Sequence, residues 1–182
     1  MEYLRAMKII QQPVNCEPVY LVDKYSDSVY KFCRSLTYSK EDAEDLFQET
    51  FLQAFEKPSK LQTVDNPQSF LFSTSLFIWK SWKRKYARRN RLAPIEPLDE
   101  TVVSNDSVED SYMIQEENRT IRELVENLPD KYKIPTILFY TLEMSVSDIA
   151  VTLHIPAGTV KSRLFKARSL VEKGLGAIQY EK

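Results

Sequence analysis

The segment that decides the fold is SVSDIAVTLHIPAGTVKSRLFKAR, residues 145–168. Ser145, followed three positions later by Asp148, is typical of a helix N-terminus. The apolar residues that follow have helical spacing and predict a short helix that ends near Leu153. The dipeptide Ile155-Pro156 then predicts a turn into a second helix. His154 lies at this turn, where the backbone can require a left-handed conformation that histidine tolerates better than most residues.

The second helix of the segment carries one apolar stripe and one basic face. We expect the stripe to be buried; it consists of Val160, Leu164, Ala167 and Val171. We expect the helix to end near Gly174, because glycine commonly terminates helices. Two helices joined by a short turn form a helix-turn-helix, whose second helix enters the DNA major groove.

The residues off the stripe have the side chains that bond base edges and phosphates. The candidate DNA-binding residues are Gly158, Thr159, Lys161, Ser162, Arg163 and Lys166. Gly158 also permits close approach of the backbone to a phosphate at the helix start. The alternative is a solvated basic helix that closes a small helical bundle.

The rest of the chain also predicts helices. The first 157 of 182 residues contain no glycine, which disfavours tight β-hairpins. Helical spacing predicts helices near 21–36, 40–57 and 66–89, and again from 107 to 128 and from 130 to 143, the last one irregular near Pro135. The fold class is therefore all-α. We expect two small helical domains, 16–91 and 107–176, joined by a flexible acidic linker at 92–106.

Charge is strongly segregated along the chain although the formal net charge is only −1. Residues 66–95 contain no Asp or Glu, and seven of the twelve residues in 80–91 are basic. Residues 92–118 contain no Lys or Arg but eight acids. This segregation predicts a surface that binds a polyanion and a separate acidic segment.

The helix that Ser39 is expected to cap carries five acids between Glu41 and Glu49. Its apolar side predicts that Asp42, Asp45, Gln48, Glu49 and Gln53 share the outer face. This face is either an ordinary solvated surface or a docking surface for a basic protein partner. A catalytic carboxylate pair is disfavoured, because the face is expected to be exposed and no His or metal cluster lies nearby in the sequence.

The helix near 66–89 becomes aromatic and basic together. Phe72, Phe77, Trp79, Trp82 and Tyr86 alternate with Lys80, Lys83, Arg84, Lys85, Arg88 and Arg89. Aromatic faces stack unpaired bases while cations follow the phosphates, so the pattern predicts a surface for single-stranded nucleic acid. In the alternative interpretation most of these aromatic residues are core. We expect Phe70, Leu71 and one or both of Phe77 and Ile78 to be core.

The sequence shows no motif for a metal, a cofactor or a membrane span. Cys16 and Cys33 belong to no close Cys/His cluster, and reduced thiols in the cytosol are the simpler interpretation, although one disulfide is possible. No apolar run approaches the ~18 residues of a transmembrane helix, and no secretory signal is visible at the N-terminus. A cytoplasmic protein without cofactor or small-molecule substrate is expected.

Three segments, in this order, resemble a bacterial RNA polymerase sigma factor of the sigma-70 family. They are DAEDLFQETFLQAF at 42–55, LPDKYKIPTILFYTLE at 128–143 and SVSDIAVTLHIPAGTVKSRLFKAR at 145–168. The two-domain length resembles the extracytoplasmic-function (ECF) group. The resemblance implies that 16–91 is a region 2 domain and 107–176 a region 4 domain.

The resemblance also implies roles for the candidate residues. Asp45, Gln48 and Glu49 match positions that dock on a coiled coil of the largest polymerase subunit, and Asp42 shares their face. The aromatic-basic helix, with Trp79, Lys80, Trp82, Lys83, Arg84 and Lys85, matches the segment that binds and opens the minus-ten promoter element. The loop around 57–66 would help to hold a flipped base, the linker would pass through the polymerase, and the helix-turn-helix would read the minus-thirty-five element. An anti-sigma factor, often membrane-bound, is an expected partner.

The leading hypothesis is therefore an alternative sigma factor with no catalytic activity of its own. A stand-alone helix-turn-helix regulator is the alternative, but it leaves the acidic and aromatic-basic helices without a role. A DNA-processing enzyme such as a recombinase is a third class, and no nucleophile or metal-ligand set supports it.

Overall fold

The computed structural model of the chain describes residues 18–56, 61, 64, 66–92 and 112–180. Every regular element among these residues is a helix, as the sequence predicts. The chain divides into two compact units, residues 1–97 and 98–182, and each is described by itself. The expected linker at 92–106 and the capping pair Ser107–Asp110 fall almost wholly outside the described residues.

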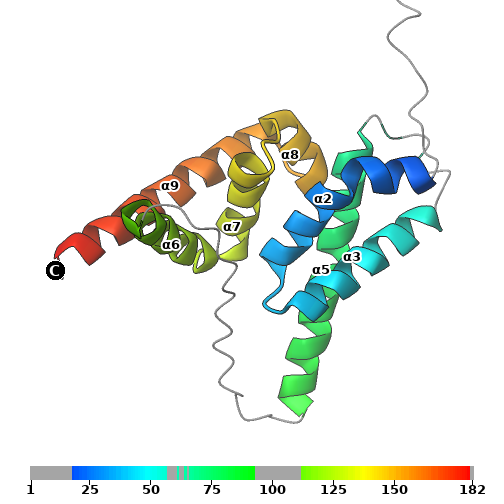
Figure 1. The fold of residues 1–182 in the computed structure, drawn as a ribbon, viewed down its shortest axis with the longest axis horizontal. Coiled ribbons are helices and arrows are strands. Elements are labelled where there is room, and N and C mark those ends of the chain that lie inside the picture. The colour runs from blue at the N-terminus through cyan, green and yellow to red at the C-terminus, as the bar shows by residue number, and fades with distance from the viewer. Residues whose placement is uncertain (1–17, 57–60, 62–63, 65, 93–111, 181–182) are drawn as a thin grey trace, which may run out of the picture. The chain divides into compact units, whose positions relative to one another are not determined.

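In the part of the first unit that the structure describes, three long helices pack against one another (Figure 1). They are α2 (Pro18–Leu36), α3 (Lys40–Phe55) and α5 (Pro67–Leu92). Their shared core includes Leu21, Val29, Phe32, Cys33 and Leu36 from α2, Ala43, Leu46, Phe51 and Ala54 from α3, and Leu71, Phe72, Leu76 and Ile78 from α5. The rings of Phe32 and Phe72 lie 4.9 Å apart between centroids, which joins α2 to α5. At about 2 kcal/mol for each large apolar side chain, this burial holds the three helices together.

Side-chain caps fix where two of these helices begin. The Ser39 hydroxyl accepts a hydrogen bond from the Asp42 amide at 3.0 Å, as the sequence predicts for this capping pair. Asn66 Oδ1 accepts from the Ser69 amide at 3.1 Å, and Pro67 occupies the first turn of α5. Each cap satisfies an amide that has no partner within its helix, and each is worth about 1 kcal/mol.

A small polar cluster lies inside the first unit. Thr50 Oγ1 and Ser75 Oγ lie 3.0 Å apart across the α3–α5 contact, and each hydroxyl also lies within hydrogen-bond distance of a carbonyl one turn earlier in its own helix. Cys33 lies beside these two hydroxyls, and burial raises the pKa of its thiol to about 12. The thiol is therefore protonated at physiological pH and does not act as a nucleophile.

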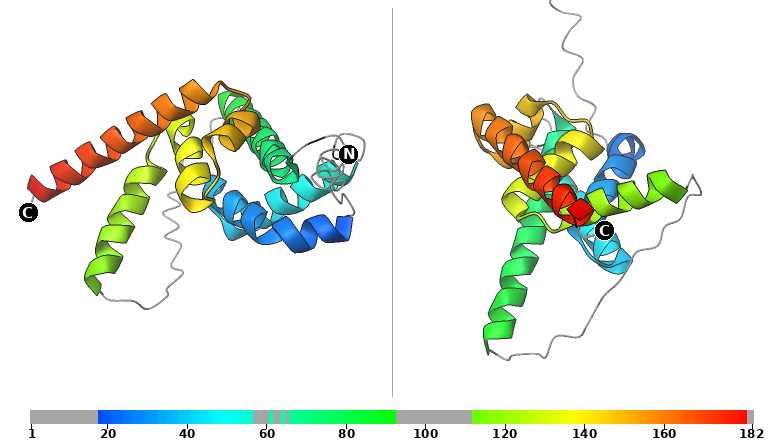
Figure 2. Two further views of the ribbon diagram at one scale, coloured as in Figure 1. Left: turned by 90° about the horizontal axis from the view of Figure 1, so that it is seen from above. Right: turned by 90° about the vertical axis from the view of Figure 1, so that its left-hand side faces the viewer.

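The two halves of α5 have different surroundings. Ile78 is the last buried residue of the helix, and Lys83 to Arg89 are all exposed. Figures 1 and 2 show the C-terminal half projecting beyond α2 and α3. The first half of α5 is thus part of the core, and the second half is a surface.

In the second unit, residues 112–180 form four α-helices and one π-helical segment. They are α6 (Tyr112–Glu126), α7 (Asp130–Thr136), η2 (Ile137–Thr141), α8 (Val146–Leu153) and α9 (Ala157–Tyr180). The buried apolar residues are Leu128, Ile134, Ile137, Leu138, Met144, Ile149, Val160, Leu164 and Ala167. Pro135 lies inside α7 directly before the π-helical segment, so the irregularity expected there is confirmed. A proline ring removes one helical hydrogen bond, and a wider turn accommodates the loss.

The turn between α8 and α9 has the conformation expected from the sequence. Ser145 Oγ accepts from the Asp148 amide at 3.1 Å and starts α8. His154 ends α8 in the left-handed region, with φ 53° and ψ 47°. The Ile155 amide then donates to the Ala150 carbonyl at 3.1 Å, which closes the end of the helix. This combination redirects the chain within a few residues, and α9 begins at Ala157.

Ile78 is buried, which confirms the expectation that one or both of Phe77 and Ile78 are core, and Phe77 is 63% exposed. Phe72, expected with the aromatic-basic residues, is fully buried and belongs to the core. On α6, Ile121 is 40% exposed although it lies seven residues, or about two turns, before the buried Leu128. The helical register places Phe72 inside the buried stripe of its helix, whereas Phe77 and Ile121 each lie beside the buried stripe.

The helix α9 does not end near Gly174 but continues to Tyr180. Gly174 serves close packing: a Cβ atom there would lie 2.5 Å from Leu124 Cδ2 on α6. The glycine therefore lets α6 approach α9, and the helix passes through it. Gly176, also helical, has open space where a Cβ would be.

We expect Gly174→Val to destabilise the second unit by about 1–3 kcal/mol, because the added side chain displaces Leu124. Gly176→Ala is the matched control and should stabilise by up to about 1 kcal/mol through helix propensity. Thermal denaturation of the full chain, followed by circular dichroism, measures both. A neutral Gly174→Val would contradict the close α6–α9 contact.

Candidate functional site

The acidic face of α3 is exposed. We call Asp42, Asp45, Gln48 and Glu49 the carboxylate ridge; the first three side chains are exposed and Glu49 is half-buried. Burial of Ala43, Leu46 and Thr50 on the opposite side of α3 turns these residues outward. Gln53, expected on the same face, is half-buried and donates from Nε2 to Glu49 Oε1 at 3.1 Å.

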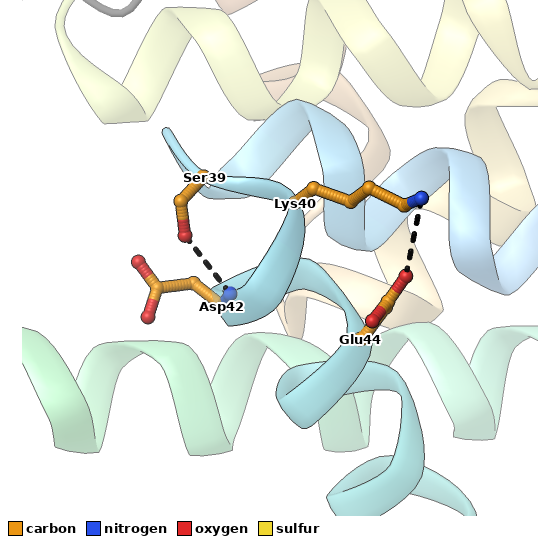
Figure 3. A network of polar contacts seen from close by, with 4 residues as sticks. All are labelled: Ser39, Lys40, Asp42 and Glu44. Carbon is orange, nitrogen blue, oxygen red and sulfur yellow. Dashed lines mark hydrogen bonds and ion pairs between the residues drawn. The ribbon is translucent and has the colours of Figure 1, made fainter.

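The charged residues of the first turn of α3 lie at a helix start that Ser39 caps. Figure 3 shows the hydrogen bond from the Asp42 amide to Ser39 and the ion pair between Lys40 and Glu44. The ion pair is long, with 3.8 Å between Lys40 Nζ and Glu44 Oε1, and both side chains are largely exposed. Such a pair contributes at most about 0.5 kcal/mol, so it leaves the Glu44 carboxylate accessible to another cation.

Sequence reasoning missed an apolar residue on the same face. Leu52 is 63% exposed and follows Gln48 by four positions and Glu49 by three, which places it on the carboxylate ridge side of α3. The same spacing that located the carboxylates could have located Leu52. An exposed leucine among carboxylates is typical of the centre of a protein–protein contact with a polar rim.

The basic half of α5 presents its cations to solvent. Lys80, Lys83, Arg84 and Lys85 are exposed, while Trp79 and Trp82 are half-buried. Lys83 Nζ lies 4.6 Å from the centre of the Trp79 ring, a cation–π distance. Tyr86 and Phe77 are each 63% exposed, so this half of the helix does offer aromatic faces next to cations.

The helix-turn-helix exposes one face of α9. Gly158, Lys161, Ser162 and Lys166 are exposed, whereas Thr159 and Arg163 are half-buried. Arg163 borders the buried stripe because it is three residues after Val160 and four before Ala167, both of which are buried. The stripe itself is confirmed at Val160, Leu164 and Ala167, and Val171 is half-buried.

Two aromatic residues near this face were not singled out from the sequence. Phe165 is 73% exposed and lies between Lys161 and Lys166 on α9. Tyr140 is 52% exposed, and the Arg168 guanidinium lies 6.0 Å from its ring centre. A helical wheel places Phe165 opposite the buried stripe, so the sequence pattern contained the information.

The described residues contain no group of three or more His, Cys, Asp and Glu side chains that could hold a metal ion. Within the same part of the chain, none of the helices combines the length and the apolar character needed to cross a membrane. What the described surfaces offer is one acidic surface and two cationic ones, each on a rigid helix.

Family comparisons match both units. The family "Sigma-70 region 2" matches residues 21–89, and the family "Sigma-70, region 4" matches residues 118–171. The first match contains the carboxylate ridge and the basic half of α5 up to Arg89. The second contains the helix-turn-helix.

Individual proteins agree with these matches. The ECF RNA polymerase sigma factor SigW of Bacillus subtilis is 31% identical over 162 residues, which cover 85% of this chain and 87% of that protein. The ECF RNA polymerase sigma-E factor of Haemophilus influenzae is 26% identical over 159 residues and covers 84% of each chain.

Solved structures show a similar fold. The sigma factor RpoE from Bartonella quintana, in complex with the anti-sigma factor NepR, superposes with a TM-score of 0.68 at 21% identity and covers 85% of this chain and 94% of that chain. CnrH, in complex with the cytosolic domain of CnrY, superposes with a TM-score of 0.63 at 17% identity and covers 88% of each chain. Taken with the two family matches and the SigW identity, these findings establish that the chain belongs to the ECF sigma factors of the sigma-70 family, the alternative sigma factors that direct transcription by RNA polymerase.

Proposed function

We propose that three surfaces divide the work of promoter-directed initiation. The carboxylate ridge docks on the coiled coil of the largest subunit of core RNA polymerase. The basic half of α5 binds and opens the minus-ten element, and the exposed face of α9 reads the minus-thirty-five element. The observation that carries the proposal is the outward orientation of all three charged faces, each of which lies opposite a buried stripe or beyond the end of the core.

Each surface fits the chemistry of its target. Carboxylates next to the exposed Leu52 suit a basic helical partner with an apolar contact. Cations interleaved with aromatic rings suit unpaired bases and their phosphates. Lys161, Ser162 and Lys166 near the start of α9 suit the edges of base pairs in the major groove.

Tethering both promoter-binding units to one polymerase raises their effective concentration, so each unit alone binds weakly. The chain itself performs no catalysis in this proposal, acts in the cytoplasm and uses the active site of the polymerase. An anti-sigma factor is the expected regulator, in line with the complex of RpoE and NepR. A stand-alone regulator would leave the carboxylate ridge without a partner.

The docking surface is tested by Asp45→Arg combined with Glu49→Arg. Both charges are reversed against a basic partner, so affinity for core RNA polymerase should fall by at least about 100-fold, the effect of like charges juxtaposed in an interface. Asp23→Arg with Glu56→Arg makes the same change of charge at exposed positions outside the ridge. Fluorescence anisotropy of labelled protein titrated with core polymerase measures both. Normal circular dichroism with unchanged affinity of the ridge variant would refute the docking role.

The opening of the minus-ten element is tested by Lys80→Ala combined with Arg84→Ala. These exposed residues are one helical turn apart, so a strand that follows α5 meets both. With preassembled holoenzyme, the fraction of promoter in the open state should fall. The dependence of the promoter-binding constant K on salt should also become shallower: the slope of log K against log salt concentration should lose about 1.4 in magnitude, which is 0.7 for each lost phosphate contact. Permanganate reactivity of unpaired thymines measures opening. Lys31→Ala with Lys40→Ala is the control, and equal effects from both pairs would refute the assignment.

The upstream contact is tested by Lys166→Ala against Lys173→Ala. Both lysines are exposed on α9, but Lys173 lies seven residues, or about 10 Å, farther from the helix start. We expect Lys166→Ala alone to weaken binding to the minus-thirty-five duplex by about 1–3 kcal/mol if it contacts a base. Footprinting with holoenzyme at fixed salt measures the loss. Unchanged occupancy with Lys166→Ala would remove this residue from the interface.

A further inference from the structure

A pocket of about 360 Å³ lies between α2 and α3, beside the carboxylate ridge. Six residues line it: Ser26, Asp27 and Tyr30 from α2, and Glu44, Phe47 and Gln48 from α3. Tyr30 and Phe47 are half-buried, whereas Asp27, Glu44 and Gln48 are exposed. The pocket therefore has aromatic rings at its base and carboxylates at its rim.

The aromatic base is a defined structure. The rings of Tyr30 and Phe47 lie 5.8 Å apart between centroids at 85°, an edge-to-face contact that joins the two helices. Phe47 also contacts Phe51, at 5.0 Å between ring centroids. Phe47 is half-buried and is one of the residues that line the pocket.

The charge of the pocket favours a cationic occupant. Two of the six lining residues are acids, one on each helix, and none is basic. Among the described residues, Glu44 forms a long, exposed ion pair with Lys40. A guanidinium group fits this arrangement, because it stacks on aromatic faces and forms paired hydrogen bonds with carboxylates. An ammonium group can also lie over a ring face, but it lacks the planar fork that stacks on the ring and forms two parallel hydrogen bonds with a carboxylate.

The geometry points to an arginine-binding pocket: Asp27 and Glu44 hold the guanidinium group of one arginine of the docking partner, which stacks on one ring of the edge-to-face pair Tyr30 and Phe47. This inference rests on the proposed docking function, because Gln48 belongs both to the pocket and to the carboxylate ridge. The partner thus contacts α2 as well as α3. One inserted side chain fixes the register of the partner helix along the ridge.

The test is the affinity of core RNA polymerase for Asp27→Asn combined with Glu44→Gln. We expect a loss of about tenfold, because the guanidinium loses both charged partners in a partly desolvated site. The matched control is Asp23→Asn combined with Glu41→Gln, which removes the same two charges from exposed positions on the same two helices outside the pocket. The control should lose less than about twofold.

A second variant fills the pocket without changing its charge. Ser26→Trp places a large side chain in the volume that the arginine needs, and should reduce affinity by about tenfold while circular dichroism stays normal. Loss of affinity in both pocket variants, with the control unaffected, supports the pocket. Unchanged affinity in the pocket variants, or an equal loss in the control, overturns it.

The proposed function and the pocket fail in distinguishable ways. If Asp45→Arg with Glu49→Arg abolishes binding to core polymerase and both pocket variants bind normally, the carboxylate ridge docks and the pocket has no role. If the ridge variant also binds normally, the docking proposal itself is wrong.

Discussion

Burial of one stripe of α3 is the constraint on which the acidic surface depends. Ala43, Leu46, Thr50 and Ala54 are fully enclosed, so the helix cannot rotate without exposing them. The hydroxyl contact between Thr50 and Ser75 adds a directional requirement, because a rotation of α3 would break this contact between the two helices, although each hydroxyl would keep the carbonyl of its own helix. The outward direction of the carboxylates is therefore a product of what lies on the other side of the helix. No attractive interaction within the acidic face is needed to explain it.

In the second unit, a buried stripe and a turn together orient α9. The stripe fixes the rotation of the helix, and the turn fixes where the helix starts. The left-handed conformation of His154 and the hydrogen bond from Ile155 to Ala150 set the direction in which the chain leaves α8. In the proposed upstream contact, the start of α9 determines which residues reach a groove, so backbone geometry at one residue affects which later residues meet DNA.

Helical periodicity was sufficient to predict the elements and most of the outward faces, because one-sided burial leaves a period of 3.6 in the sequence. Helical periodicity gave wrong predictions for residues whose type fits two different structural roles. Gly174 resembles a stop signal when only its own helix is considered, and its packing against Leu124 is visible only once α6 is in place. Phe47 and Phe72 have the same side chain, but Phe72 is fully buried against Phe32 of α2 whereas Phe47 is half-buried. The pocket between α2 and α3 depends on the distance between two helices, which no single-helix pattern contains.

The unequal surroundings along α5 have a consequence for its backbone. From Lys83 to Arg89 every residue of the helix is exposed, so mainly local hydrogen bonds and helix propensity oppose the opening of this part. Amide protons in this half should exchange with solvent at rates set by brief fraying, whereas those of the first half should exchange only when the whole unit unfolds. Nucleic acid bound along the basic half would then stabilise the helical state of this segment. Part of the free energy of the contacts would go into ordering the helix, so amide exchange would slow and the measured affinity would be lower than the contacts alone would give.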